Sequence, residues 1–171
     1  MIGNVHATDD SGARFTAHLG DESDTERAGA ALAEGLSAGI VVYLAGDLGA
    51  GKTTLVRGCL RALGHAGKVK SPTYTLIEPY TVSRLDLYHF DFYRFSTPDE
   101  FLEAGLEEYF AGQGACLVEW PDKAAPHVPP PDMEVRLAVR GAGREIEVLG
   151  RTENGRRCAL TMLSSLQASQ P

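Results

Sequence analysis

The sequence has 171 residues, 43% of them apolar, which is enough for one packed domain, and we expect a single domain over residues 1–171. A net charge of −7 excludes a basic surface over the whole molecule for binding nucleic acid, and the longest apolar run, residues 40–45, is too short to cross a membrane. Three widely spaced cysteines and the lack of a signal-peptide pattern predict a cytoplasmic protein with reduced thiols.

The first half of the chain alternates between strand and helix patterns. Residues 14–19 are typical of a strand, and Ser23-Asp24-Thr25-Glu26 is a capping box that starts a helix, which ends at Gly39. Residues 40–44 form a continuous apolar run of the kind found in strands buried on both faces. A glycine-rich loop follows, and then a helix from Lys52 to about Leu63.

The second half contains strands, a short helical region and a hairpin. We expect strands over 85–93 and 115–119, a helix that starts at the capping box 97–100 and breaks at Gly105, and an extended connector over 121–131. Residues 133–139 and 145–149 predict an antiparallel hairpin, followed by a helix over 157–166 and a frayed tail over 167–171. The pattern predicts an α/β fold with a mixed sheet, parallel at its centre with antiparallel additions.

The loop after the first buried strand carries the strongest chemical signal. Residues 46–53, GDLGAGKT, match the P-loop pattern G-x-x-x-x-G-K-[ST], and they lie between a strand and a helix as that motif requires. Backbone amides of such a loop surround phosphate oxygens, the lysine reaches the β- and γ-phosphates, and the hydroxyl binds Mg²⁺. The predicted nucleotide-binding residues are Asp47, Leu48, Gly49, Ala50, Gly51, Lys52, Thr53 and Thr54.

Two acidic residues are candidates for the metal site. Asp91 lies in an aromatic strand and Glu119 ends an apolar one, and a carboxylate in such a strand is costly to bury without a partner. A nearby Mg²⁺, to which Thr53 would also contribute, explains both, and a solvent-facing strand residue is the alternative. Thr73, in Ser71-Pro72-Thr73-Tyr74, could sense the γ-phosphate, although Ser-Pro by itself is more typical of a simple turn. His89 alone is more typical of a packed strand residue than of a catalyst.

Together these motifs resemble the bacterial TsaE family. The P-loop, SPTY at 71–74, HFDFYR at 89–94 and VEWP at 118–121 occur in the order and spacing of that family, and the resemblance covers about residues 20–135. It implies a P-loop NTPase three-layer fold, ATP/ADP and Mg²⁺ as ligands, and an ATPase needed for threonylcarbamoyladenosine next to the anticodon of tRNA. It also implies partnership with the TsaD–TsaB heterodimer, contact with tRNA only through that partner, and catalytic roles for Lys52, Thr73, Asp91 and Glu119.

Other functions remain open from the sequence. A small P-loop metabolite kinase fits the length and topology, with Arg140 and Arg144 as a possible basic lid, although both also fit the end of a hairpin. A GTPase is disfavoured because the guanine-reading Asn-Lys-x-Asp motif is absent. A nucleotide-dependent assembly module is the non-enzyme alternative. The acidic segment 96–132, with eight acids and one base, is either a docking surface or a solvated helix face.

Overall fold

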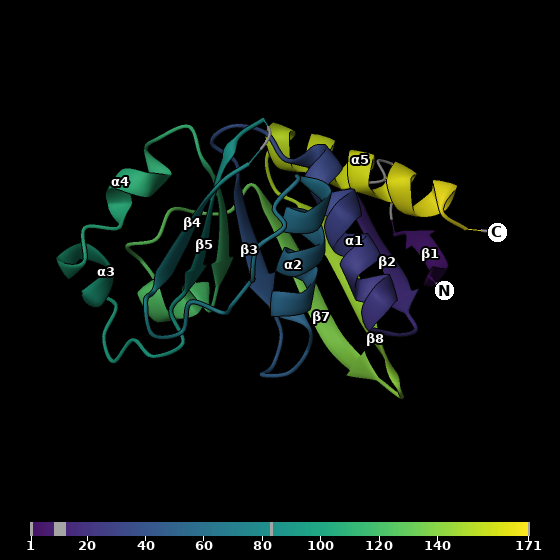
Figure 1. The fold of residues 1–171 in the computed structure, drawn as a ribbon, viewed down its shortest axis with the longest axis horizontal. Helices are drawn as coiled ribbons and strands as arrows, with labels where there is room; N and C mark the ends of the chain where they lie inside the picture. The colour runs from purple at the N-terminus through teal and green to yellow at the C-terminus, as the bar shows by residue number, and fades with distance from the viewer. Residues whose placement is uncertain (1, 9–12, 83, 171) are drawn as a thin grey trace.

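The computed structural model describes residues 2–8, 13–82 and 84–170 (Figure 1). The strands are β1 (Ile2–Ala7), β2 (Arg14–Leu19), β3 (Val41–Ala45), β4 (Ile77–Thr81), β5 (Asp86–Asp91), β6 (Ala115–Glu119), β7 (Met133–Arg140) and β8 (Gly143–Gly150). The helices are α1 (Glu22–Gly35), α2 (Lys52–Ala62), α3 (Glu100–Glu103), α4 (Glu107–Phe110) and α5 (Glu153–Ala168), with a 3₁₀ helix, η1, at Pro121–Ala124.

Within these residues the strands form one eight-stranded mixed sheet in the order β1-β2-β8-β7-β3-β6-β5-β4. The centre is parallel: β3 pairs with β7 on one side and β6 on the other, and β6 pairs with β5. The flanking pairs β1–β2, β2–β8, β7–β8 and β4–β5 are antiparallel. The predicted fold class, an α/β sheet with a parallel centre and antiparallel additions, is confirmed.

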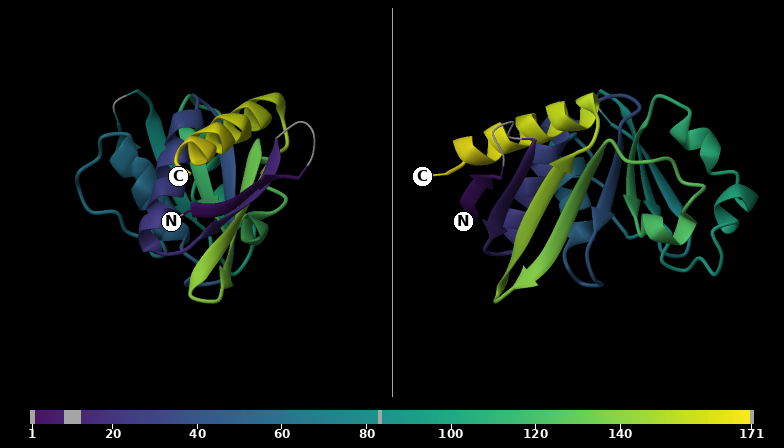
Figure 2. Two further views of the ribbon diagram at one scale, coloured as in Figure 1. Left: turned by 90° about the vertical axis from the view of Figure 1, so that its right-hand side faces the viewer. Right: turned by 180° about the vertical axis from the view of Figure 1, so that it is seen from behind.

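The sheet separates two apolar clusters, because successive strand side chains point to opposite faces. The larger cluster includes Val42 and Leu117 and packs under α1, α2 and α5. The smaller cluster includes Val41 and Val118, the sequence neighbours of those residues, together with aromatic side chains from β5, α3 and α4. Figures 1 and 2 show α1, α2 and α5 covering one face and α3 and α4 lying at the β4–β5 end.

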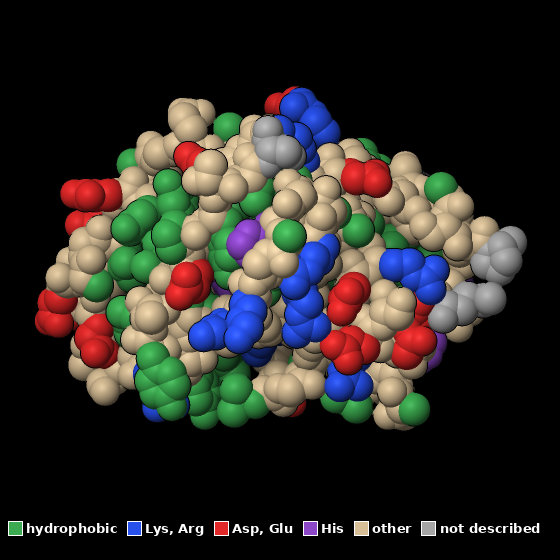
Figure 3. Space-filling view, in the orientation of Figure 1, with side chains coloured by type: hydrophobic (Ala, Val, Ile, Leu, Met, Phe, Trp, Pro, Cys, Tyr) green, Lys and Arg blue, Asp and Glu red, His purple; other side chains and the backbone are tan. Residues whose placement is uncertain are grey.

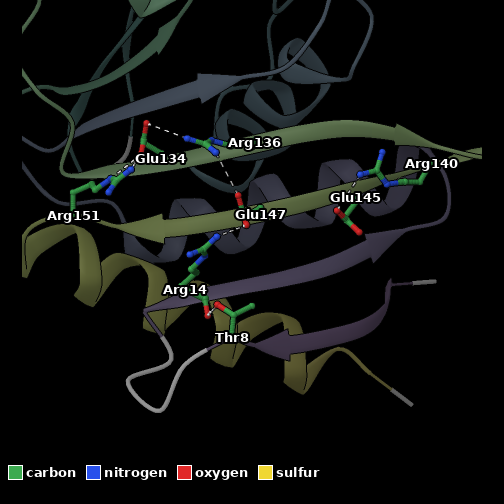
Figure 4. Close-up of polar contacts among 8 residues, drawn as sticks. All are labelled: Thr8, Arg14, Glu134, Arg136, Arg140, Glu145, Glu147 and Arg151. Carbon is green, nitrogen blue, oxygen red and sulfur yellow. Dashed lines mark hydrogen bonds and ion pairs between the residues drawn. The ribbon is translucent and has the colours of Figure 1, made fainter.

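Strands β2, β7 and β8 have a polar outer face, on the side of the sheet away from α1, α2 and α5. Seen from behind in Figure 2, β7 and β8 carry no helix over them. Figure 4 shows charged side chains paired across β7, β8 and β2, including Arg136 with Glu147 and Arg14 with Glu147. Exposed ion pairs contribute only about 0–1 kcal/mol each, so this network keeps the face polar and adds little to stability.

Several expected element boundaries are corrected by the structure. Helix α1 is capped by Asp21 and not by the expected Ser23, because the Asp21 carboxylate accepts the backbone N–H of Asp24 at 2.8 Å, and the helix therefore begins at Glu22. It ends at Gly35, four residues before the expected Gly39. The expected connector 121–131 contains the 3₁₀ helix η1, and neither β1 nor β4 was foreseen.

The other local expectations agree better with the structure. Glu100 accepts the backbone N–H of Thr97 at 3.0 Å, which is half of the expected capping box, and the helical region breaks at Gly105. The hairpin is present as β7 and β8. Helix α5 is longer than expected, because Thr152 caps it and it runs to Ala168, into the expected tail. Residue 171 of that tail lies outside the described residues.

Two features concern the thiols and the helices of the whole molecule. The three cysteines are free, buried thiols, and burial raises the pKa of each to about 12. No helix in the described ranges is long and apolar enough to span a bilayer.

Figure 3 shows Lys and Arg side chains gathered near α2, with acidic side chains to either side of them. This matches the uneven charge of the sequence, in which residues 41–95 hold seven bases and four acids.

Helices α1 and α2 cross with their backbones in contact, which requires glycine on both. A Cβ at Gly58 would lie 2.1 Å from the carbonyl oxygen of Glu26, and one at Gly29 would lie 2.1 Å from that of Leu55. Both neighbours are backbone atoms, which cannot rotate away as a side chain can. The two glycines therefore set the distance between the helix that follows the P-loop and the helix that supports it.

We predict that Gly58→Ala lowers the free energy of unfolding by about 1–3 kcal/mol, the usual cost of overpacking. Alanine favours a helix by about 1 kcal/mol over glycine, so a loss of stability can come only from the clash with α1. Urea denaturation measures the change. Gly112→Ala is the control, because its Cβ would meet its nearest neighbour at 3.7 Å. Equal stability of Gly58→Ala and the wild type would contradict this account of the helix contact.

Candidate functional site

The P-loop connects β3 to α2 and leaves the start of that helix open. Gly51 stands before the first residue of α2 with φ +109°, a left-handed backbone that glycine adopts without strain. Within the described part of the chain no side chain caps this helix end, and its first turn carries no acidic residue. The free amides and the positive end of the helix dipole therefore suit an anion such as a phosphate group.

A cavity of about 450 Å³ lies at this helix end. Nine of the predicted site residues line it: Leu48, Gly49, Gly51, Lys52, Thr53, Thr54, Thr73, Asp91 and Glu119. Two predicted residues, Asp47 and Ala50, do not line it. The Ala50 side chain is buried, and its backbone N–H donates to the carbonyl of Asp47 at 3.1 Å, so these two residues form the turn of the loop.

Lys52 is buried at the centre of the site, with 5% of its surface exposed. Its Nζ donates a hydrogen bond to the carbonyl oxygen of Gly46 and lies 4.3 Å from the centre of the Trp120 ring. Burial lowers the pKa of the Lys52 ammonium below its usual value, while the carboxylates of Glu119 and Asp91 act in the opposite direction. The ammonium donates to a neutral carbonyl here, and a bound polyanion would give it an anionic acceptor.

The motif HFDFY divides between the two faces of the sheet. Phe90 and Phe92 enter the smaller apolar cluster, where their rings pack 5.8 Å apart. Asp91 and Tyr93 point to the other side and line the cavity, and His89 is buried on the same side as Asp91. The alternation in this segment thus anchors the strand on one face and builds the site on the other.

The two carboxylates lie side by side because Asp91 and Glu119 are partners in the parallel register of β5 and β6. Both are 3% exposed. Asp91 Oδ2 accepts the hydroxyls of Ser71 at 2.8 Å and Thr73 at 3.2 Å, and its Oδ1 accepts the backbone N–H of Tyr93 at 2.9 Å. Thr73 is therefore tied to Asp91, and the SPTY segment lies against the end of β5.

Glu119 has a different partner. Its Oε2 lies 2.6 Å from Nε2 of His89, which is fully buried. His89 is a buried strand residue, as expected from the sequence. Its contact with the carboxylate of Glu119 was not predicted.

The donors at the cavity fit a magnesium ion. Thr53, Asp91 and Glu119 offer only hydroxyl and carboxylate oxygens, the hard ligands that Mg²⁺ prefers, and Mg²⁺ commonly keeps several waters and few protein ligands. Over residues 2–8, 13–82 and 84–170, no group of three or more His, Cys, Asp or Glu side chains is gathered as a metal cluster. An ion at this site would therefore rely on one hydroxyl, the two carboxylates and non-protein oxygens.

The sequence did not predict the contacts that Arg144 and Trp120 make at the site. Arg144 donates from Nε to the carbonyl of Ala50 at 2.9 Å and from Nη2 to that of Gly49 at 3.1 Å, so it holds the P-loop rather than forming a free lid. Trp120 has a left-handed backbone, φ 56°, directly after β6, which brings its ring over Lys52. Neither contact has a local signal, since Arg144 is 94 residues from Ala50.

A second, smaller cavity of about 240 Å³ shares Gly49, Gly51 and Thr54 with the first. Arg144 lines it together with residues of the α1 start. The two cavities thus meet at the P-loop, and together they have room for a ligand longer than a phosphate group.

The chain is similar to proteins of one known family. Residues 19–146 match the family described as "Threonylcarbamoyl adenosine biosynthesis protein TsaE". The chain is 42% identical over 147 residues to the tRNA threonylcarbamoyladenosine biosynthesis protein TsaE of Haemophilus influenzae, covering 83% of this chain and 93% of that protein. It is 40% identical over 126 residues to the TsaE protein of Treponema pallidum, covering 73% and 93%.

A solved structure gives the same result for the fold. The crystal structure of YdiB from Bacillus subtilis superposes with a TM-score of 0.74 and 30% sequence identity, covering 94% of this chain and 96% of that one. With the match to the family over residues 19–146, this means that the chain belongs to the TsaE family.

Proposed function

We propose that the protein is a magnesium-dependent ATPase that supports formation of threonylcarbamoyladenosine next to the anticodon of tRNA, acting with the TsaD–TsaB heterodimer. The observation that carries the proposal is the convergence of Lys52, Thr53, Asp91 and Glu119 on one cavity at the start of α2. Its relatives are named for tRNA threonylcarbamoyladenosine biosynthesis, which supplies the process. We propose one domain over residues 1–171.

The residues of the chain have distinct roles in this proposal. The P-loop amides and Lys52 bind and orient the β- and γ-phosphates, and the second cavity receives the nucleoside. Thr53, Asp91 and Glu119 hold Mg²⁺, which when bound neutralises phosphate charge. A carboxylate accepts a hydrogen bond from the attacking water, whose oxygen forms a bond to the γ-phosphorus as the bond from that phosphorus to the bridging oxygen breaks. The products are ADP, inorganic phosphate and a proton. Thr73 would exchange its contact with Asp91 for one that reports the γ-phosphate.

Contact with tRNA is proposed to be indirect. Affinity for nucleic acid depends largely on Lys and Arg side chains that neutralise phosphates, and this chain carries a net charge of −7. The basic side chains near α2 are too few to overcome that balance. The free, buried thiols suit a cytoplasmic protein, as does a role in tRNA modification.

A metabolite kinase is the alternative with the same P-loop. It is disfavoured because Arg144 is bound to the P-loop and Arg140 lies 3.6 Å from Glu145, so these two side chains are engaged as they stand. Incubation with γ-labelled ATP distinguishes the two functions. Label released as free phosphate supports an ATPase, label transferred to a metabolite supports a kinase, and no release supports a binding module.

We predict that Lys52→Ala abolishes productive use of ATP. A hydrogen bond to a charged group contributes about 1.5–3 kcal/mol, so nucleotide affinity should fall by at least about tenfold. A fluorescent ATP analogue measures binding, and phosphate release measures turnover. Lys68→Ala is the control, since Lys68 is an exposed lysine outside the cavity. Hydrolysis at the wild-type rate by Lys52→Ala would remove the P-loop from the mechanism.

We predict that Asp91→Asn and Glu119→Gln weaken the response to magnesium while the fold is retained. Each change keeps the shape of the side chain and removes the negative charge that an ion requires. Magnesium titrations of ATP hydrolysis measure the effect, with circular dichroism as the check on folding. Asp86→Asn, an exposed carboxylate on the same strand as Asp91, should behave as the wild type. A variant with an unchanged titration would show that its carboxylate has only a structural role.

We predict that the isolated protein hydrolyses ATP well below the roughly 10 s⁻¹ typical of enzymes, and that purified TsaD and TsaB accelerate it. The reason is that Thr73 is held on Asp91 and needs a partner to be reordered around the nucleotide. Phosphate release is measured with and without the pair, and with TsaD alone as the control. Fast hydrolysis by the lone chain, unaffected by the pair, would contradict partner-dependent turnover.

A further inference from the structure

The buried His89 ring contacts the buried Glu119 carboxylate through only one of its two ring nitrogens. Nε2 of His89 lies 2.6 Å from Oε2 of Glu119, and the histidine is fully buried. Its other ring nitrogen, Nδ1, is the one buried side-chain polar atom of the described residues that has no hydrogen-bond partner. The ring is therefore committed to Glu119 through a single nitrogen.

This geometry selects the position of the proton. A proton on Nδ1 would be a buried donor without an acceptor, which is costly, whereas a bare lone pair at Nδ1 is less so. If Glu119 carried the proton and donated it to Nε2, the neutral ring would have to carry its own proton on Nδ1. The tautomer that leaves no buried ring N–H without an acceptor carries the proton on Nε2 and donates it to Oε2 of Glu119.

We infer that His89 is a positioning residue for Glu119 in the proposed ATPase reaction. Its Nε2–H fixes Oε2 and leaves Oε1, for which no protein hydrogen bond occurs among the described residues, as the oxygen that serves the cavity. The inference rests on the proposed function, in which Glu119 acts on the metal or the attacking water.

The two carboxylates are thereby distinguished. Both oxygens of Asp91 already accept hydrogen bonds, from Ser71 and Thr73 at Oδ2 and from the backbone of Tyr93 at Oδ1. Glu119 has one oxygen engaged by His89 and one without a donor among the residues that the structure describes. Of the two carboxylates, Glu119 therefore has the oxygen that is free to accept a bond from the cavity. That oxygen is Oε1, because His89 engages Oε2.

The first test compares His89→Gln with His89→Leu in the full-length protein. The glutamine amide can place a donor near the position of Nε2, whereas leucine fills similar space and donates nothing. We expect His89→Leu to lower kcat by about 10- to 100-fold, the usual effect of losing such a supporting hydrogen bond, with KM for ATP within about threefold of the wild type. We expect His89→Gln to recover most of that loss.

The second test does not depend on hydrolysis. In protein labelled with ¹⁵N at its five histidines, His89 should give the signature of a neutral ring protonated on Nε2. That signal should shift in Glu119→Gln and stay unchanged in the control Asp86→Asn. This measurement decides the hydrogen bond even where a substitution at His89 prevents folding.

Each outcome has a defined meaning. Wild-type kcat in His89→Leu, or an equal loss in two folded variants, would overturn the positioning role. A ring protonated on Nδ1, or a His89 signal that does not respond to Glu119→Gln, would overturn the hydrogen bond itself. A wild-type protein that releases no phosphate from ATP, alone or with TsaD and TsaB, would overturn the proposed function instead, and the NMR result would still stand.

Discussion

The adjacent carboxylates of Asp91 and Glu119 are the constraint around which the rest of the site is organised. The parallel register of β5 and β6 makes them neighbours, and both are almost completely buried. Two like charges in such a place are costly unless other groups compensate. The compensation comes from three directions: hydroxyls of the SPTY segment on Asp91, His89 on Glu119, and the positive charge of Lys52 at the start of α2.

This constraint explains why the site needs both halves of the fold. The strands that carry the carboxylates follow α2 in sequence, and Lys52 is the first residue of α2, directly after the P-loop. The hairpin of β7 and β8 then adds Arg144, which holds the carbonyls of Gly49 and Ala50. With both carbonyls directed toward Arg144, the Gly51 amide, on the opposite side of its peptide plane, points away from that side chain. The hairpin therefore helps to shape the P-loop without contributing a residue to the larger cavity.

The parts that the sequence predicted are those with a local signal. The P-loop lies between an apolar run and a helix, Glu119 ends a five-residue apolar strand, and the hairpin alternates over both arms, so each could be recognised from neighbouring residues. Strand β4 escaped prediction because it is an edge strand with Pro79 in its middle. The contacts of His89 with Glu119, and of Arg144 with the P-loop, depend on the strand register and on pairs 30 and 94 residues apart, which no local pattern contains.

Two strained residues connect the site to the aromatic cluster on the other face of the sheet. Leu76 and Trp120 both have left-handed backbones without being glycine, at φ 68° and φ 56°, and each such residue costs about 1–3 kcal/mol. Leu76 ends the segment that carries Thr73, and its carbonyl accepts the backbone N–H of Asp91 at 3.0 Å. Trp120 directly follows Glu119.

The side chains of both residues pack against the smaller apolar cluster, and this burial offsets the strain of their backbones. The phenylalanines of the HFDFY segment, which contribute nothing to the cavity, form the core of that cluster. They therefore hold the loops that carry Thr73 and Trp120 in place beside Lys52. The aromatic residues of the motif are therefore part of the site's construction, because they form the apolar surface on which the side chains of Leu76 and Trp120 are packed.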